Sequence, residues 1–378
     1  MRIREVRAAG LRGGTPLGGW TEELTPNDVV HTLIAVHTDE AVVGLGSVFT
    51  SENLVRAALD VLSPLLVGES ALEPERVAEK LHQNTFWLGR GGSVTHTISG
   101  IDTALWDILG QVTGQPVGRL LGGRYRDRVM PYASVLMDEP ARMCAELQEL
   151  RDAGFRAYKI GWGPFGRVDA RTDEKIVSAA RDTVGPDALL AVDAGGSDAH
   201  WAGDYKWALR TAAMLDRYDV AWFEEALVAD ALEDFAKLRD SSPVRISGGE
   251  TLTRRQSFTP YLQARAWDIV QPDVTKVGGL SEVRRIAWAA EENGVKMIPH
   301  GWNTVVGLAA DLQLASAIAG TDLVEYRTGS AYIDLLGEAD LKLDQDGMLE
   351  IPDVPGLGVR LDLDALARYT DGQSLFGV

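Results

Sequence analysis

The sequence contains one cysteine, Cys144, and only six histidines among 378 residues. A single thiol cannot form a disulfide within the chain, which fits a reducing compartment. No apolar run is long enough to span a bilayer, and the first residues lack the continuous apolar stretch of a signal peptide. We therefore expect a soluble, cytoplasmic protein.

Basic residues are also scarce. Lys and Arg together number 37 against 55 Asp and Glu, which gives a formal net charge of −18. Nucleic acids and anionic membranes bind surfaces with clustered Lys and Arg, so neither partner is expected. Hydrophobic residues make up 45% of the chain, which is enough for the cores of one domain of about 250 residues and a smaller second domain.

Short apolar segments alternate with stretches of helical periodicity between residues 126 and 335. The apolar segments read VMPYASV, FRAYKI, ALLAVD, VAWFEE, VRISGGE, DIVQPD, VKMIPH and DLVEY. Strands that alternate with helices form parallel sheets, and about eight such units have the size of a (β/α)8-type barrel, here a modified TIM barrel. An open doubly wound sheet is the alternative, but no G-x-G-x-x-G turn follows the first strand.

The two ends of the chain have a different pattern. Residues 1–125 begin with alternating apolar and polar residues in IREVRAAGLRGG and HTLIAVHTDEAVVGLGS, followed by helical stretches. This order is typical of an N-terminal α+β capping domain. Residues 336–378 return to extended, turn-rich sequence, and we expect this segment to pack back onto the cap.

Ionisable residues follow most of the expected barrel strands. In such barrels the side chains at the C-terminal ends of the strands converge on one cavity. A single carboxylate there could cap a helix or face solvent. The ordered set predicts a functional site instead, and it comprises Lys159, Asp193, Glu224, Glu250, Asp273, His300 and Glu325.

Three of these residues form an expected metal site. Asp193, Glu224 and Glu250 would place three carboxylates around one point, a strongly self-repulsive arrangement unless a cation is present. Oxygen ligands alone favour one Mg²⁺ per subunit, since zinc would recruit His or Cys. Asp273 could fix the tautomer of His300 and leave its second nitrogen as a base, although a buried His satisfied by a nearby acid is also common.

At this point the motifs resemble a known family. SGIDTALWDILGQVTGQPVGRLLGG, GFRAYKIG, AVDA, WFEEA, GGE, QPDVTKVGGLSE, PHGW, VEY and PDVPGLGV occur in the order found in the mandelate racemase subgroup of the enolase superfamily. Glu250 and the later Asp273–His300 pair match this subgroup. Muconate-lactonising relatives typically carry Asp as the metal ligand of the fifth strand, and their bases are Lys residues on strands two and six. The resemblance implies that Mg²⁺ binds the substrate carboxylate, that a protonated Glu325 donates a hydrogen bond to it, and that the protein is a homo-oligomer.

The second strand departs from the family pattern. The subgroup usually carries Lys-x-Lys there, but this chain has Lys159, Ile160 and Gly161. A racemase needs a base on each face of its substrate, whereas a syn dehydration needs only His300. The resemblance, together with Gly161 in place of the second Lys, favours a hydro-lyase that dehydrates an acid sugar to a 2-keto-3-deoxy acid.

Three alternatives stay open at this point. A racemase or epimerase of an α-hydroxy or amino acid would use Lys159 and His300. His200 could act as a separate acid in an anti elimination. The third alternative is not an enzyme but a barrel that binds a metal or a sugar acid without catalysis.

Several residues could select the small-molecule carboxylate substrate. Two belong to expected cap loops, and four follow the second and seventh barrel strands: Trp20, Phe49, Trp162, Arg167, Trp302 and Asn303. Arg167 could bind the distal carboxylate of a diacid.

Overall fold

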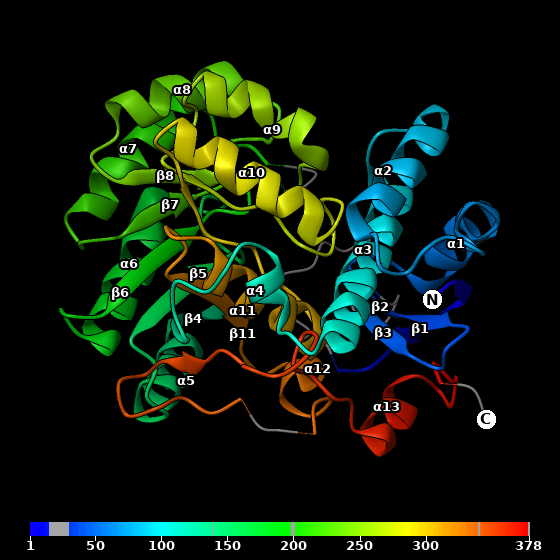
Figure 1. Ribbon diagram of the computed structural model, residues 1–378. Helices are drawn as coiled ribbons and strands as arrows, with labels where there is room; N and C mark the ends of the chain where they lie inside the picture. The colour runs from blue at the N-terminus through cyan, green and yellow to red at the C-terminus, as the bar shows by residue number, and fades with distance from the viewer. Residues whose placement is uncertain (15–29, 138, 198–200, 339–340, 377–378) are drawn as a thin grey trace.

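The structure, a computed structural model, describes residues 1–14, 30–137, 139–197, 201–338 and 341–376. It contains a small antiparallel sheet with its own helices beside a larger parallel sheet ringed by helices (Figure 1). The predicted capped barrel is therefore confirmed. The proposed boundaries at residues 125 and 335 stay predictions.

The cap consists of three strands and three long helices. The strands are β1 (Ile3–Leu11), β2 (His31–Thr38) and β3 (Val43–Val48), in the order β1-β2-β3, and the helices are α1 (Glu52–Leu66), α2 (Pro74–Thr85) and α3 (Gly92–Thr113), with the 3-10 helix η2 (Phe86–Leu88) after α2. Alternate residues of the central strand β2 face two cores. Ile34 and Val36 pack among the cap helices, while Leu33 and Ala35 belong to the core that continues into the barrel.

Helix α3 lies directly against β3 because glycines leave room for it. A side chain at Gly44 would come within 2.0 Å of the Ala104 carbonyl oxygen, and one at Gly46 within 1.9 Å of the Gly100 carbonyl oxygen. Small residues at these positions thus let the helix backbone contact the sheet.

Eight parallel strands form the barrel. They are β4 (Arg128–Leu136), β5 (Ala157–Gly161), β6 (Leu189–Asp193), β7 (Trp222–Glu224), β8 (Arg245–Gly248), β9 (Ile269–Val270), β10 (Lys296–Met297) and β11 (Leu323–Arg327). Pairing runs continuously from β10 back through β9 to β4 and then to β11. One residue from most strands, including Tyr132, Ala191 and Trp222, fills the interior.

A helix follows each of the first seven barrel strands. These are α5 (Pro140–Asp152), α6 (Ala170–Val184), α7 (Tyr205–Asp216), α8 (Leu232–Ser241), α9 (Arg254–Gln263), α10 (Leu280–Glu292) and α11 (Val305–Ala317). The helix that directly follows the last barrel strand is the four-residue α12 (Ala331–Asp334). The short α4 (Val117–Leu120), which precedes the barrel, packs on α11. The barrel therefore departs from eight equal units at its last unit.

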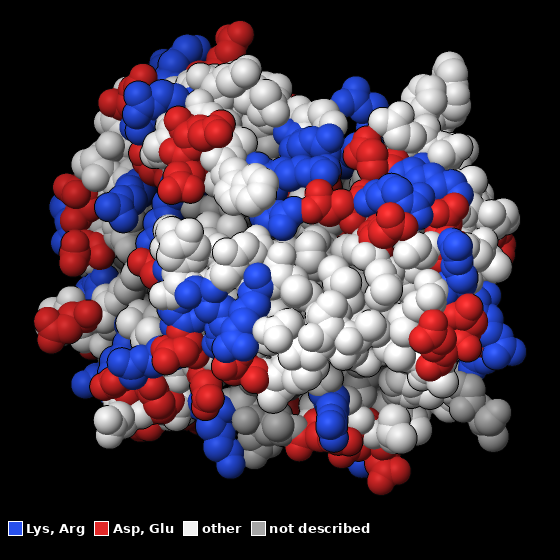
Figure 2. Space-filling view, viewed as in Figure 1, with Lys and Arg blue, Asp and Glu red and all other residues white. Residues whose placement is uncertain are grey.

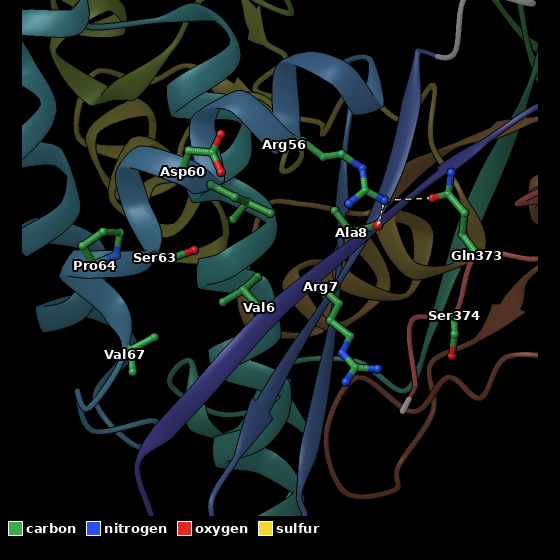
Figure 3. Close-up of a pocket in the computed structure, with 11 residues that line it drawn as sticks. Val6, Arg7, Ala8, Arg56, Asp60, Ser63, Pro64, Val67, Gln373 and Ser374 are labelled. Carbon is green, nitrogen blue, oxygen red and sulfur yellow. Dashed lines mark hydrogen bonds between the residues drawn. The ribbon is translucent and has the colours of Figure 1, made fainter. Parts of the chain in front are cut away.

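The C-terminal segment contacts both the barrel and the cap. Its strand β12 (Leu349–Glu350) pairs antiparallel with β4, and its helix α13 (Leu363–Tyr369) precedes residues that reach the cap sheet. There the His37 Nε2 lies 2.8 Å from the Leu375 carbonyl oxygen. A surface groove of about 970 Å³ lies between β1, α1 and this segment. At this groove the Arg56 guanidinium donates to Ala8 O and Gln373 Oε1 (Figure 3).

The surface shows no extended basic face in the view of Figure 2, where Lys and Arg are interspersed with Asp and Glu. Ion pairs also cross from the cap to the barrel. Arg284 and Arg285 of α10 both pair with Glu75 of α2, the Arg285 Nη2 at 2.8 Å. None of the described helices combines the length and the apolar character needed to cross a membrane.

Asp102 of α3 links the cap to the start of α10 through buried hydrogen bonds. Its carboxylate accepts hydrogen bonds from Ser281 N at 2.9 Å and from Ser281 Oγ at 2.6 Å. The nearby Ser99 Oγ accepts one from Gly278 N at 2.8 Å. The cap helix therefore satisfies free backbone amides around the first turn of a barrel helix.

We expect Asp102→Ala to lower the free energy of unfolding by about 2 to 4 kcal/mol, because it leaves buried donors without an acceptor. Urea unfolding followed by circular dichroism measures this change. Asp60→Ala, at an exposed position of α1, is the control and should change stability by less than about 0.5 kcal/mol. Equal effects of the two variants would contradict the proposed link.

The same carboxyl should make stability depend on pH. Burial raises the pKa of Asp102 from 3.8 to about 7, so folding takes up a proton at pH values between these two pKa values. The stabilisation from this proton is complete below the pKa of the unfolded chain and is lost as pH rises through the pKa of the folded protein. Relative to Asp102→Asn, the wild type should lose on the order of a few kcal/mol between about pH 5 and 8. A constant difference across that range would contradict the shift.

Candidate active site

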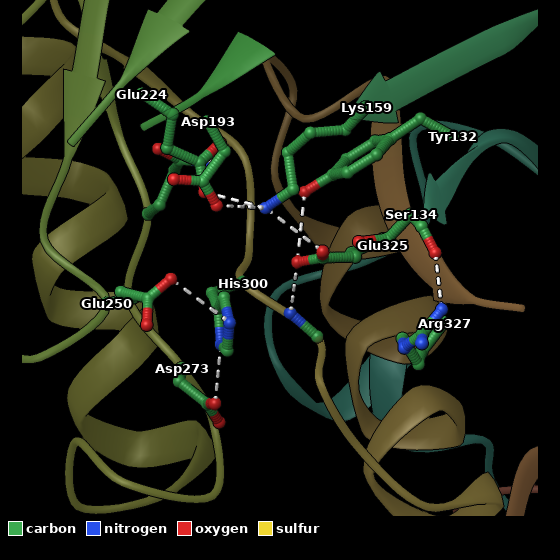
Figure 4. Close-up of polar contacts among 12 residues, drawn as sticks. Tyr132, Ser134, Lys159, Asp193, Glu224, Glu250, Asp273, His300, Glu325 and Arg327 are labelled. Carbon is green, nitrogen blue, oxygen red and sulfur yellow. Dashed lines mark hydrogen bonds and ion pairs between the residues drawn. The ribbon is translucent and has the colours of Figure 1, made fainter. Parts of the chain in front are cut away.

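Three carboxylates converge at the C-terminal ends of neighbouring strands. Asp193 ends β6, Glu224 ends β7, and Glu250 follows β8. Each offers an oxygen, and these oxygens all lie within 4.8 Å of one another in a buried position (Figure 4). The strand register explains the convergence, since Asp193 pairs directly with Glu224.

Each of the first two carboxylates is held by further donors. Glu224 Oε1 accepts from Lys159 Nζ at 2.6 Å, and Glu224 Oε2 accepts from Trp222 Nε1 at 3.0 Å and Gln271 Nε2 at 2.7 Å. Asp193 Oδ1 accepts from Gly195 N at 2.8 Å. Trp222 and Gln271 were not predicted as site residues from the sequence, although a Gln directly after the apolar β9 was a usable signal.

The electrostatics of the three carboxylates favour a cation. Burial and then the Glu224 carboxylate raise the pKa of Asp193 well above its usual value. Glu225, which follows Glu224 in the sequence, is also buried. Burial, and then the Glu250 carboxylate, raise its pKa well above its usual value. Hard oxygen donors in a buried, negatively charged cluster suit a divalent metal ion, which would relieve the repulsion. The residues present therefore fit such an ion.

Lys159 lies between two sets of acids. Besides Glu224, its Nζ lies 3.0 Å from Glu325 Oε1 and 3.5 Å from Asp193 Oδ2. Burial alone would lower the pKa of this ammonium group, but Glu224 and Glu325 outweigh burial and raise it well above its usual value. In this arrangement Lys159 keeps its proton, so it is poorly suited to act as a base.

His300 and Asp273 form the expected pair. His300 Nδ1 lies 2.7 Å from Asp273 Oδ2, while Asp273 Oδ1 accepts from Thr275 N at 2.7 Å and Thr275 Oγ1 at 2.6 Å. This leaves the other ring nitrogen, Nε2, facing Glu250 Oε2 at 3.2 Å (Figure 4). Burial lowers the pKa of His300, but the Glu250 carboxylate makes the largest opposing contribution, and the net shift is upward. The free nitrogen therefore points at the acidic cluster.

Glu325, at the middle of β11, is held by several donors. Its Oε2 accepts from Gly301 N at 2.8 Å and Tyr132 OH at 3.2 Å, in addition to the Lys159 contact at Oε1. Burial would raise its pKa, but Lys159 and then His300 lower it to about 2. The buried ammonium of Lys159 beside it favours the ionised form of Glu325, and the protonated carboxyl that the resemblance implies stays a prediction.

The side chains expected to line the substrate site lie around these groups where they can be described. Phe49 of the cap has its ring 4.3 Å from Lys276 Nζ, and Trp302 has its ring 4.5 Å from the guanidinium of Arg327. Asn303 is buried and donates to Asp311 of α11. Trp20 and His200 lie outside the described residues.

Two further candidates lie on the loop after β5. Trp162 has a left-handed backbone with φ of 63°, and a side chain at Gly195 would come within 2.9 Å of its indole. Such a backbone conformation is unusual for a bulky residue and is often found at functional sites. The Arg167 guanidinium donates to the carbonyl oxygens of Phe165 and Ala194 and lies over Trp201.

Two cap histidines near the site were not predicted. His31 opens β2, is 1% exposed and lies edge-on to the Phe49 ring at 5.1 Å. Burial lowers the pKa of His31 to about 3 and that of His96 to about 4. Both imidazoles are therefore neutral and add hydrogen-bonding groups without charge on the cap side of the barrel.

These features define a capped barrel with a carboxylate cluster and a His–Asp pair where its strands end. Residues 142–365 match the family model described as enolase C-terminal domain-like, and residues 24–122 match that of the mandelate racemase/muconate lactonizing enzyme N-terminal domain. The chain belongs to the mandelate racemase/muconate lactonizing enzyme family of the enolase superfamily.

Curated relatives cover nearly the whole chain. A D-galactarolactone cycloisomerase of Agrobacterium fabrum is 32% identical over 90% of this chain and 91% of that protein. A D-xylonate dehydratase of Haloferax volcanii is 33% identical over 91% and 86%. An arabinonate dehydratase of Saccharolobus solfataricus is 31% identical over 91% of each. The relatives thus include hydro-lyases and a cycloisomerase.

Solved structures agree with this assignment. The 3,6-anhydro-D-galactonate cycloisomerase from Zobellia galactanivorans has a TM-score of 0.87 and 28% identity, covering 98% of this chain and 99% of that one. A racemase from Streptomyces coelicolor with bound magnesium has a TM-score of 0.84 and 27% identity, covering 97% and 99%.

We expect Glu250→Gln to weaken Mg²⁺ or Mn²⁺ binding by about a hundredfold or more, because it removes one charge from the cluster. Isothermal titration calorimetry measures the affinity. Glu233→Gln, at an exposed site on α8, should leave it unchanged. Unaltered metal affinity in Glu250→Gln would contradict the assigned metal site.

Proposed function

We propose that the protein is a Mg²⁺-dependent dehydratase of an acid sugar. The observation that carries the proposal is the placement of His300 Nε2, the one ring nitrogen not used by Asp273, beside the carboxylate cluster. The relatives that act on xylonate and arabinonate support the substrate class, and the magnesium bound by the Streptomyces coelicolor racemase supports the choice of metal.

The proposed reaction is a β-elimination with one base. Mg²⁺ held by Asp193, Glu224 and Glu250 would neutralise the charge that develops on the substrate carboxylate as the α-proton leaves. His300 Nε2 takes this proton, and Asp273 stabilises the resulting imidazolium. The imidazolium then protonates the departing β-hydroxyl, so that a C–H and a C–O bond break and water leaves. The enol product tautomerises to a 2-keto-3-deoxy acid.

Gly161 argues against a second base on the opposite face. A side chain at this position would begin 2.8 Å from the Asp193 Cβ, so a Lys would require the neighbouring strand to shift. Lys159 keeps its proton between its carboxylate partners, as described above. A racemase using Lys159 and His300 is therefore the weaker candidate.

Ring opening is a second candidate, because the Agrobacterium and Zobellia relatives are cycloisomerases. The chemistry at His300 would be the same, with a ring oxygen as the leaving group in place of a hydroxyl. Dehydration releases water, whereas ring opening gives a product isomeric with the substrate. Product mass distinguishes them.

Incubation with Mg²⁺ and a library of mono- and diacid sugars, with their lactones and anhydro forms, in D₂O tests these candidates. We expect a 2-keto acid that has lost one water, detected by proton NMR and mass spectrometry. A 2-keto acid without loss of water would favour ring opening. Deuterium in unchanged or inverted substrate without a keto product would contradict both.

His300→Asn should lower turnover of the identified substrate by about a hundredfold to ten-thousandfold, the usual range for loss of a general base. Mg²⁺ affinity should stay within about threefold, because the variant keeps the three carboxylates. His37→Asn, at a histidine that bonds Leu375 in the cap, is the control. Unchanged turnover in His300→Asn would contradict the elimination, and also a racemase that uses His300.

A cytoplasmic location and a homo-oligomeric state fit the proposed role in carbohydrate acid catabolism, and both stay predictions. Fractionation of cells and light scattering of the purified protein would measure them.

A further inference from the structure

A buried acid lies directly behind the loop that carries His300. Asp311 is 1% exposed and belongs to α11, whose 13 residues are all buried. Asn303, also 1% exposed, precedes this helix and donates from Nδ2 to Asp311 Oδ2 at 3.3 Å. The only charged residue of a fully buried helix needs a compensating partner.

The other oxygens of the same two side chains are unsatisfied. Asn303 Oδ1 and Asp311 Oδ1 are both buried and have no hydrogen-bond partner within the part of the chain that the structure describes. Among the described residues, Asp311 also takes part in no ion pair. A buried acceptor without a donor destabilises the fold, and an unpaired buried carboxylate destabilises it more. A single proton on Asp311 Oδ1 gives that oxygen a donor role toward Asn303 Oδ1.

We propose that Asp311 is a neutral carboxylic acid that pairs with the amide of Asn303 through two reciprocal hydrogen bonds and so positions the loop from His300 to Thr304. In one bond Asn303 Nδ2 donates to Asp311 Oδ2, and in the other Asp311 Oδ1 donates to Asn303 Oδ1. Asn303 then has a positioning role in place of the substrate contact expected from the sequence.

The electrostatic surroundings agree with this protonation state. Burial raises the pKa of Asp311 well above its usual value, and the carboxylates of Asp273 and Glu325 raise it further. The hydrogen bond from Asn303 opposes these effects without overcoming them.

The loop has contacts on both sides that make its position matter. Gly301 N donates to Glu325 Oε2 at 2.8 Å, and a side chain at Gly301 would lie 3.5 Å from Asp311 Oδ2. Thr304 Oγ1 accepts from Gly307 N at the start of α11 and donates to Ser47 Oγ of the cap at 3.0 Å. The acid–amide pair therefore supports the segment that connects His300, Glu325 and the cap.

Infrared spectroscopy tests the protonation state without any substrate. The difference spectrum of wild type minus Asp311→Asn, recorded in D₂O at neutral to mildly alkaline pH, should contain the carbonyl band of a protonated carboxylic acid. Carboxylate bands in its place would overturn the proposal. This result does not depend on the proposed dehydratase activity.

Kinetics test the positioning role, which rests on the proposed function. Asp311→Asn keeps a neutral hydrogen-bonding pair, so kcat should stay within about threefold, whereas Asp311→Leu should lower kcat by at least about tenfold with little change in KM or Mg²⁺ affinity. The exchange variant Asn303→Asp/Asp311→Asn rebuilds the pair in reverse and should recover kcat relative to Asp311→Leu.

Two kinetic outcomes would overturn the role. One is an Asp311→Asn variant as impaired as Asp311→Leu, and the other is an unchanged kcat in Asp311→Leu. If Asp311→Leu does not fold, the Asn and exchange variants still decide, because loss of kcat in both contradicts the pair. Failure of every sugar acid to react would contradict the proposed function, while the infrared result would still stand.

Discussion

The repulsion among three buried carboxylates is the constraint on which the rest of the site depends. Asp193, Glu224 and Glu250 lie close enough to bind one ion, and the strand register brings the first two together. Lys159 offsets part of their charge at 2.6 Å from Glu224. Because Lys159 pairs with these acids, His300 is the base in the reaction that we propose.

The ring of His300 is held by a short chain of hydrogen bonds. Asp273 fixes one nitrogen, and Thr275 fixes Asp273. Behind the loop, the buried pair of Asn303 and Asp311 supports the backbone that also contacts Glu325 and the cap. The cap thus completes the site physically, through Thr304 and the aromatic and histidine side chains of its first strands.

The sequence predicted the barrel because apolar runs and helical stretches alternate, and it predicted the cluster of three carboxylates because acids follow consecutive strands. The short helix α12 after the last strand could not be predicted from the sequence. Nor could the packing of α4, from a segment before the barrel, on α11, because this contact joins segments far apart in the chain. The charge of Glu325 depends on the position of Lys159, which no spacing shows. Asp311 was not predicted as a site residue, although it is the single charged residue of α11. Its partner Asn303 lies on the preceding loop, and the sequence does not show this contact.

A crystal structure with Mg²⁺ and a slowly reacting sugar acid tests the central claim most directly. The account predicts one ion bound by Asp193, Glu224 and Glu250, the substrate carboxylate on that ion, and the α-hydrogen directed at His300 Nε2. An ion bound elsewhere, or an α-hydrogen directed at the face of Gly161, would contradict it.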